Sequence, residues 1–346
     1  MKTAPLDRPM EPTPLTAGVE TMKAIVQDEY GTAPEVVLRI EEVARPTIGD
    51  DEVLVQVRAA SVDRGTWHAM AGLPYLIRIA GFGLRAPKAP NPGRSVAGTV
   101  ESVGKDVTGF EPGDEVYGTC DGSFAEYAAA RARRLAPKPA NVSFEQAAAV
   151  PVSALAALQA VRDRARVQAG QKVLIIGASG GVGTFAVQIA KAFGAEVTGV
   201  CSTAKTELVR AIGADHVVDY TREDFTRSGG PYDLAIDIAG SRPFSAYRRL
   251  LAEGATAVIV GGSKRNRWLG PLGNVIRARV ASIGKSQRVV FFVADVNRDD
   301  LSFLRELIEQ GKVRPVIDST YGLSDVPDAI RHLAEGHPHG KIVISV

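Results

Sequence analysis

A glycine-rich segment is the part of this 346-residue sequence best suited to binding a ligand: Gly177-Ala178-Ser179-Gly180-Gly181-Val182-Gly183. It directly follows an apolar run at residues 172–176, which is typical of a buried strand, and apolar spacing predicts a helix at about residues 181–193. Glycine lets the backbone turn sharply and approach a ligand closely, and the first helical turn offers N–H groups to anionic oxygens. Strand, glycines and helix in this order predict a dinucleotide site.

The residues after the next strand, residues 196–201, bear on which dinucleotide binds. An NAD site usually has an acidic residue there, which accepts hydrogen bonds from the ribose hydroxyls. This sequence has Ser202, Thr203 and Lys205 instead. Two hydroxyls and an ammonium can donate to a 2′-phosphate, which an acid would repel, so the segment favours NADPH over NADH. In the alternative interpretation, Ser202 only caps the next helix and Lys205 is a solvated surface charge.

The elements that position these residues alternate between strand and helix from Ser143 onward. Ser143 and Gln146 have the spacing of a capping box at a helix start. Strands are predicted at residues 172–176, 196–201, 216–220, 234–238 and 257–260, and helices at 181–193, 204–212, 244–251 and 299–310. This repeated pattern predicts an α/β fold with a Rossmann-type, doubly wound parallel sheet.

The preceding part of the chain, residues 22–139, is rich in short strand-like runs separated by turn residues, which predicts a β-barrel or sandwich. Within it, residues 67–90 are apolar and aromatic without strand alternation, as in many binding loops. Residues 1–21 carry four prolines and are expected to form a flexible extension. Strands near Val316 and Ile342 could return to the β-rich part.

Composition excludes several classes of protein. The length predicts two domains, and a net charge of +2 from 41 basic and 39 acidic residues gives no reason to expect nucleic-acid binding. Two cysteines are too few for a disulfide framework, which favours a cytoplasmic location. No apolar run reaches the roughly 18 residues of a membrane span.

The glycine segment, together with Gln188-Ile189-Ala190-Lys191-Ala192-Phe193-Gly194-Ala195, resembles the medium-chain dehydrogenase/reductase superfamily, and its zinc-independent quinone oxidoreductase branch in particular. Glu111-Pro112-Gly113-Asp114 and Gly340-Lys341-Ile342-Val343 strengthen the resemblance. It implies a GroES-like β-barrel catalytic domain at residues 22–148 and about 291–346, and a Rossmann NADPH-binding domain at about 149–290. It also implies a homodimer or homotetramer.

The resemblance assigns cofactor-binding residues. Ser179, Gly180, Gly181 and Val182 would hold the pyrophosphate. Lys205 and Tyr220 would contact the 2′-phosphate, and Val260-Gly261 would lie along the nicotinamide. Phe291, with Phe292, could close the nicotinamide end of the cleft, although a pair of strand core residues explains them almost as well.

The same resemblance places Asp63, Arg94 and Val152 at the zinc-ligand positions of metal-dependent relatives. A cationic arginine would repel a metal, and no cysteine–histidine cluster exists, so we expect no metal site. His337 and His339 are expected to form an exposed turn.

Without a Lewis acid, the expected reaction is hydride transfer from NADPH to a carbon activated by conjugation, as in a quinone or an α,β-unsaturated carbonyl. Candidates for a proton donor or oxyanion partner are Asp63, Trp67, His68 and Tyr75. Each also has a structural explanation: Trp67 in packing, His68 at the surface, and Asp63 in a turn cap or an ion pair with Arg64.

A basic stretch at residues 264–288 leaves two alternatives open, because it contains no acidic residue. It could hold a phosphate-bearing substrate, as in an acyl-thioester (enoyl-CoA-type) reductase, although a solvated basic rim is the commoner explanation. The second alternative is a non-catalytic protein that binds NADPH or nucleic acid.

Overall fold

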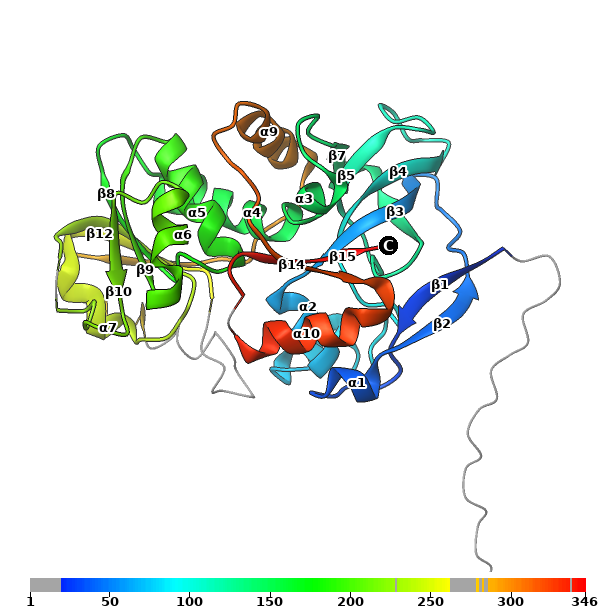
Figure 1. The fold of residues 1–346 in the computed structure, drawn as a ribbon, viewed down its shortest axis with the longest axis horizontal. Helices are drawn as coiled ribbons and strands as arrows, with labels where there is room; N and C mark the ends of the chain where they lie inside the picture. The colour runs from blue at the N-terminus through cyan, green and yellow to red at the C-terminus, as the bar shows by residue number, and fades with distance from the viewer. Residues whose placement is uncertain (1–19, 228, 262–277, 280–281, 283–285, 337) are drawn as a thin grey trace, which may run out of the picture.

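Two β-sheets organise the described part of the chain, which in this computed structural model comprises residues 20–227, 229–261, 278–279, 282, 286–336 and 338–346. Figure 1 shows them as two lobes, with α4 (Pro151–Leu158) lying between. The predicted extension at residues 1–21 falls almost entirely outside the described residues, and the first strand, β1 (Thr21–Val26), begins at its end.

The first sheet has six parallel strands, all described, which confirms the predicted doubly wound α/β fold. Its order is β10 (His216–Asp219), β9 (Glu196–Cys201), β8 (Lys172–Ile176), β11 (Tyr232–Asp237), β12 (Leu251–Ile259) and β13 (Arg288–Phe291). The chain order reverses between β8 and β11. A crevice at such a reversal, beyond the carboxyl ends of the strands, is where ligands bind in this class of sheet.

Both faces of this sheet are covered, which explains why its strands are continuous apolar runs. In β8, Val173 and Ile175 belong to one buried cluster and Leu174 and Ile176 to another. The first cluster includes residues from α4, α5 (Gly181–Ala192), α6 (Thr206–Ala211) and α9 (Arg298–Glu309), and the second includes α7 (Phe244–Tyr247).

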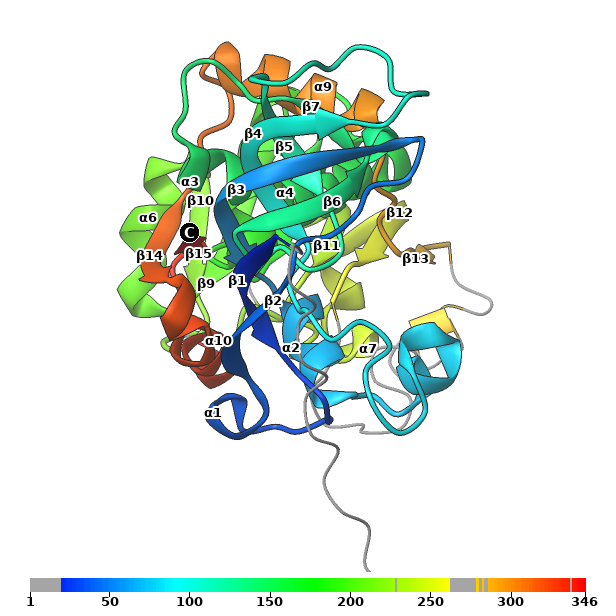
Figure 2. The same cartoon turned by 90° about the vertical axis from the view of Figure 1, so that its right-hand side faces the viewer.

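The second sheet combines strands from the first half of the chain with strands near its C-terminal end. Its order is β14 (Ile317–Gly322), β15 (Lys341–Ser345), β3 (Glu52–Val62), β4 (Ser95–Val103), β5 (Glu115–Thr119) and β7 (Leu135–Pro137), and β6 (Tyr127–Arg131) also pairs with β3. Figure 2 shows this lobe with α1 (Pro34–Val37), α2 (Arg64–Ala71) and α10 (Val326–Glu335) gathered below the sheet. The hairpin of β1 and β2 (Arg39–Ala44) lies beside it.

A polar cluster joins the segment that follows β13 to the helical residues that continue α4. Gln159 donates from Nε2 to the Asp300 carboxylate at 2.8 Å and to the Asp295 carbonyl at 2.8 Å. Arg162 donates to Asp300 at 2.7 Å. From the other lobe, the buried Tyr117 hydroxyl donates to the Leu301 carbonyl at 2.6 Å. The start of α9 is therefore bonded to both lobes.

Several predicted elements differ in extent. The predicted capping box is confirmed at the start of α3 (Phe144–Ala148). The helix predicted at residues 244–251 is present as α7 followed by a 3-10 turn, Arg248–Leu250, and it ends one residue early because Leu251 already pairs with Tyr232 of β11. The loop predicted at residues 67–90 begins inside α2, because the Asp63 side chain accepts the Thr66 N–H and caps that helix.

Replacing Asp300 with asparagine tests the polar cluster. Burial raises the pKa of Asp300, but hydrogen bonds from Gln159, Arg162 and Asn297 outweigh this effect, so the net pKa lies below its usual value. We expect Asp300→Asn to reduce the free energy of unfolding by about 1–3 kcal/mol at neutral pH, measured by urea denaturation. The deficit should begin to shrink as the pH falls below about 4, where the unfolded aspartate takes up a proton, and should vanish only below the lowered pKa of the folded carboxylate. Asp299→Asn, an exposed change on the same helical turn, is the control. An equal loss in both variants, or a deficit independent of pH, would contradict this role.

Candidate cofactor and active site

The glycine segment lies where the dinucleotide prediction needs it, between the carboxyl end of β8 and the start of α5. Gly180 is the N-cap of α5 and has no side chain to cap it, so the amides of the first turn are not satisfied by a cap. Uncapped N–H groups and the positive end of a 12-residue helix form a site for phosphate oxygens. That Ser179, Gly180, Gly181 and Val182 hold a pyrophosphate remains a prediction from the resemblance.

Two of the glycines are required by the backbone geometry of the loop, one by its φ angle and one by a close contact. Gly177 has a φ of +90°, in the region that side chains disfavour. A Cβ atom on Gly183 would lie 2.1 Å from the Gly177 carbonyl oxygen. The helix can approach the strand this closely only with glycine at position 183.

The C-terminal segment crosses this loop, which the sequence did not indicate. The Gly340 N–H donates to the Ser179 carbonyl at 3.1 Å, and Gly180 and Gly340 form a parallel bridge. Lys341 follows and is 2% exposed, with its side chain against Gly181. Sequence reasoning used Lys341 only as part of a family motif, although a lysine opening an apolar strand directly after glycine was a detectable anomaly.

The residues predicted to bind the 2′-phosphate gather at the carboxyl ends of β9 and β10. The Tyr220 N–H bonds to the Cys201 carbonyl at 3.0 Å, which places exposed Tyr220 beside the segment containing Ser202. Lys205 is half-buried and donates to the Pro338 carbonyl at 3.0 Å. Burial lowers its pKa, and Asp318 partly offsets this effect. Ser202 forms no side-chain cap, contrary to the structural alternative for that residue.

Asp219 is a carboxylate at this end of the sheet that the sequence analysis did not consider. It accepts from the Thr203 hydroxyl at 2.5 Å and from the Thr221 hydroxyl at 2.6 Å. These hydroxyl hydrogen bonds lower its pKa. Thr203 is therefore already engaged, and Asp219 reaches this place from β10 rather than from the end of β9, where acidic residues are usually sought.

The opposite end of the crevice is built around Asp237, at the carboxyl end of β11. The N–H groups of Val260 and Gly261 donate to its carbonyl, at 2.9 and 3.3 Å. Its carboxylate accepts from the Gly240 N–H at 2.8 Å and from the buried Tyr247 hydroxyl at 3.3 Å. Burial raises the pKa of Asp237 to about 6. Gly261 must be glycine, because a Cβ there would lie 2.0 Å from the Ile238 carbonyl oxygen.

Phe291 and Phe292 point into different cores. Phe291 ends β13, pairs in register with Ile259, and packs against the cluster that contains Tyr247. Phe292 is buried in the larger cluster, with Arg164 stacked over its ring at 5.2 Å. These contacts match the core-pair interpretation, and a role for Phe291 at the nicotinamide remains a prediction.

Of the four pocket candidates, Asp63 and Trp67 share the first turn of α2. Asp63 is 7% exposed; its Oδ1 atom accepts from the Thr66 N–H at 3.0 Å, whereas its Oδ2 atom has no hydrogen-bond partner. The indole Nε1 of Trp67 is also buried without a partner. Buried polar atoms without partners are uncommon and suggest a site that a ligand or water completes.

His68 is half-buried and is held in one tautomer. Its Nδ1 atom lies 2.7 Å from the Leu73 carbonyl, which can only accept, so Nδ1 carries the proton. Burial lowers the pKa of His68, and the charge of Arg64 adds to this effect. Near neutral pH the ring is therefore uncharged, and Nε2 is an acceptor rather than a proton donor.

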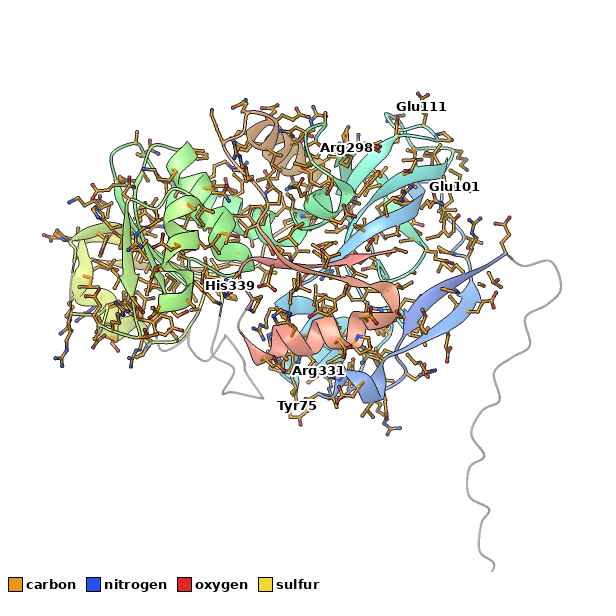
Figure 3. All side chains as sticks on the ribbon, viewed as in Figure 1. Tyr75, Glu101, Glu111, Arg298, Arg331 and His339 are labelled. Carbon is orange, nitrogen blue, oxygen red and sulfur yellow. The ribbon has the colours of Figure 1, made fainter. Side chains whose placement is uncertain are left out.

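Tyr75 is not brought next to Asp63. It follows the far end of α2, where Arg78 stacks over its ring at 5.0 Å. Figure 3 shows it at the lower edge of the molecule, away from the parallel sheet, whereas His339 lies between the C-terminal segment and that sheet.

The three positions that would carry zinc in metal-dependent relatives do not fit a metal. Asp63 caps a helix, Arg94 is exposed, and Val152 is half-buried near the start of α4. Within residues that the structure describes, no three His, Cys, Asp or Glu side chains gather as a metal site. Nor does that part of the chain include a helix long and apolar enough for a membrane crossing.

Most of the basic stretch and one of the two turn histidines lie outside the described residues. These are Lys264, Arg265, Arg267, Arg277, Lys285 and His337. The interpretations that depend on them remain predictions.

Comparison with known proteins agrees with this geometry. Residues 49–140 match a family described as "Alcohol dehydrogenase GroES-like domain", and residues 212–344 match "Zinc-binding dehydrogenase". The chain is 30% identical over 338 residues to the chloroplastic quinone-oxidoreductase QR1 of Triphysaria versicolor, covering 93% of this chain and 98% of that protein. It is 33% identical over 341 residues to the NADPH-dependent alkenal/one oxidoreductase of Arabidopsis thaliana, covering 93% and 79%.

A solved quinone oxidoreductase from Coxiella burnetii superposes with a TM-score of 0.82 at 28% identity, covering 94% of this chain and all of that one. The fold and site thus define an oxidoreductase with a nicotinamide cofactor site and a GroES-like lobe. The chain belongs to the medium-chain dehydrogenase/reductase superfamily. One of the matching descriptions implies zinc, but the residues at the ligand positions do not support it.

Asp237→Asn tests the buried carboxylate at the crevice. An unfolded aspartate has a pKa near 3.9, and Asp237 has one of about 6, so between these values the folded state retains a proton that the unfolded state has lost. Its contribution to stability is fully present below about pH 4 and is lost as the pH rises through about 6, by roughly 3 kcal/mol.

We expect Asp237→Asn to remove this pH dependence and to be more stable than the wild type at pH 7, because the amide can bond to the Gly240 N–H and the Tyr247 hydroxyl. Urea denaturation at several pH values measures the effect. Asp233→Asn, on the same strand, serves as the control. If the free energy of unfolding of the wild type did not fall between about pH 4 and 6, Asp237 would ionise in the folded state with little loss of stability, which would contradict this prediction.

Proposed function

We propose that this protein is an NADPH-dependent oxidoreductase that reduces a quinone or an α,β-unsaturated carbonyl without a metal. The observation that carries the proposal is the uncapped start of α5, with Lys205 and Tyr220 gathered at the neighbouring strand ends. Bound there, NADPH would supply a hydride. The protein would hold the pyrophosphate on the α5 amides and the 2′-phosphate near the Lys205 ammonium.

The preference for NADPH rests on charge. Ser202, Thr203 and Lys205 stand where NAD sites carry an acid. Asp219 lies close by, but two threonine hydroxyls donate to its oxygens and Arg222 lies 3.6 Å away, which partly neutralise it. The Arabidopsis relative is named NADPH-dependent, which supports the same choice.

The first turn of α2 supplies groups suited to a carbonyl substrate. The Trp67 indole N–H is an unpartnered donor available to a carbonyl oxygen, and Asp63 offers an unpartnered acceptor. Neutral His68 can accept a hydrogen bond through Nε2. These groups orient a conjugated acceptor without polarising it as strongly as a metal would, which suits substrates that are already activated.

We also propose the lobe boundaries, the assembly and the location of the protein. The lobe boundaries are residues 22–148 with about 291–346, and about 149–290. Assembly as a homodimer or homotetramer would use an edge of the parallel sheet, where β13 is the last strand. A cytoplasmic location accords with two free, buried cysteines, although some relatives are named as mitochondrial or chloroplastic.

Lys205→Met tests the cofactor assignment. Losing a charge-assisted bond to the 2′-phosphate should weaken NADPH binding by about tenfold to a hundredfold, while NADH binding changes little. Fluorescence titration with both dinucleotides measures the ratio. Lys191→Met, which removes an ion pair with Asp215 on the same lobe, is the matched control. Equal wild-type affinity for NADH and NADPH would refute the NADPH preference.

A substrate screen tests the reaction. We expect NADPH absorbance to fall with quinones, enals or enones, and excess EDTA to leave the rate unchanged. Faster turnover of enoyl-CoA esters would favour the acyl-thioester alternative. Tight NADPH binding without turnover of any of these compounds would favour the non-catalytic alternative.

A further inference from the structure

Lys341 is a buried cation that the proposed reaction does not use. It opens β15 directly after the crossing at Gly340, and its side chain is 2% exposed. Its ammonium donates to the Val62 carbonyl at 3.0 Å. Among the described residues the structure gives Lys341 no salt bridge. Buried lysines are almost always paired, but the one charge that acts on this ammonium, the Asp63 carboxylate, forms no salt bridge with it.

The surroundings of Lys341 place it between the phosphate loop and the start of α2. Its Cδ atom lies 3.0 Å from where a Cβ on Gly181 would be, so any larger residue at position 181 would displace it. On the other side, Val62 and Asp63 end β3 and begin α2. The carboxylate of Asp63 is the charge that acts on the ammonium, and its Oδ2 atom has no partner. Ser153 of α4 also reaches Gly181, but it carries no charge.

Burial of this kind disfavours the charged form of an amine. It lowers the pKa of Lys341, and Asp63 only partly reverses the effect. The pyrophosphate of a dinucleotide on the α5 amides would bring negative charge to the loop that the Lys341 stem touches. In surroundings of low dielectric, a nearby anion acts more strongly on an ammonium than it does in water.

We propose that Lys341 is a positioning residue that takes up a proton when the dinucleotide binds, and that its ammonium then links the pyrophosphate to the α2 pocket through the Val62 carbonyl and Asp63. The proton comes from solvent and goes to Nζ, and no other bond changes. This inference rests on the proposed cofactor site, but not on the choice between NADPH and NADH or on the substrate.

The test is calorimetric titration of the full-length protein with NADH in buffers of different ionisation enthalpy, between about pH 8 and 10. This window lies below the ordinary lysine pKa of about 10.4. It lies above the titration of Asp237 and His68, whose pKa values are about 6 and below the usual histidine value. NADH lacks the 2′-phosphate, which removes any contribution from Lys205.

We expect wild-type protein to take up a substantial fraction of one proton per NADH bound, with an affinity that falls as the pH rises. Lys341→Met should abolish the uptake and weaken NADH and NADPH binding by similar factors, about tenfold. Lys205→Met, the matched control, should keep the uptake with NADH. A lysine that only braces β15 against β3 would change the thermal unfolding temperature without any proton uptake in the wild type.

Wild-type binding of NADH without proton uptake anywhere in this window would overturn the inference, whether or not Lys341→Met folds. Uptake that persists in folded Lys341→Met would also overturn it. Failure of both dinucleotides to bind would instead refute the proposed function.

Discussion

The close contact between the phosphate loop and the start of β15 is the constraint on which the rest of the site depends. Gly340 bonds to the Ser179 carbonyl, and the missing side chain of Gly181 leaves room for the Lys341 stem. Through this contact the last strand of one lobe touches the loop that would hold the cofactor in the other. The segment at Val62 and Asp63 is therefore joined to this loop by backbone and by the Lys341 ammonium.

Three ionisable side chains are buried in these two lobes. Asp237, Asp63 and Lys341 are each at least nine-tenths buried, and none forms a salt bridge among the described residues. Taking an unpaired charge out of water is costly, so such groups persist where a ligand or a reaction uses them. Asp237 has two hydrogen bonds to compensate, whereas Asp63 has one atom satisfied and one without a partner.

Local patterns predicted the parallel sheet well, because β8 and α5 carry their periodicity and glycines within one short stretch. These patterns failed where residues that are distant in the sequence determine the local structure. The helix predicted to reach Leu251 stops one residue earlier, because Leu251 pairs with β11. Asp219 reaches Thr203 from a neighbouring strand, so a search along β9 alone misses it. Tyr75, only twelve residues from Asp63, is carried away by the length of α2.

By itself, the sequence determined that this chain has a doubly wound α/β layer and a glycine-rich turn between a strand and a helix of that layer. These conclusions depend on residue type and short-range spacing. Only the tertiary structure decided which tautomer His68 adopts, which hydroxyl Asp219 engages, and that Lys341 is buried at the loop. Burial and pairing depend on residues far apart in the sequence, so no local pattern encodes them.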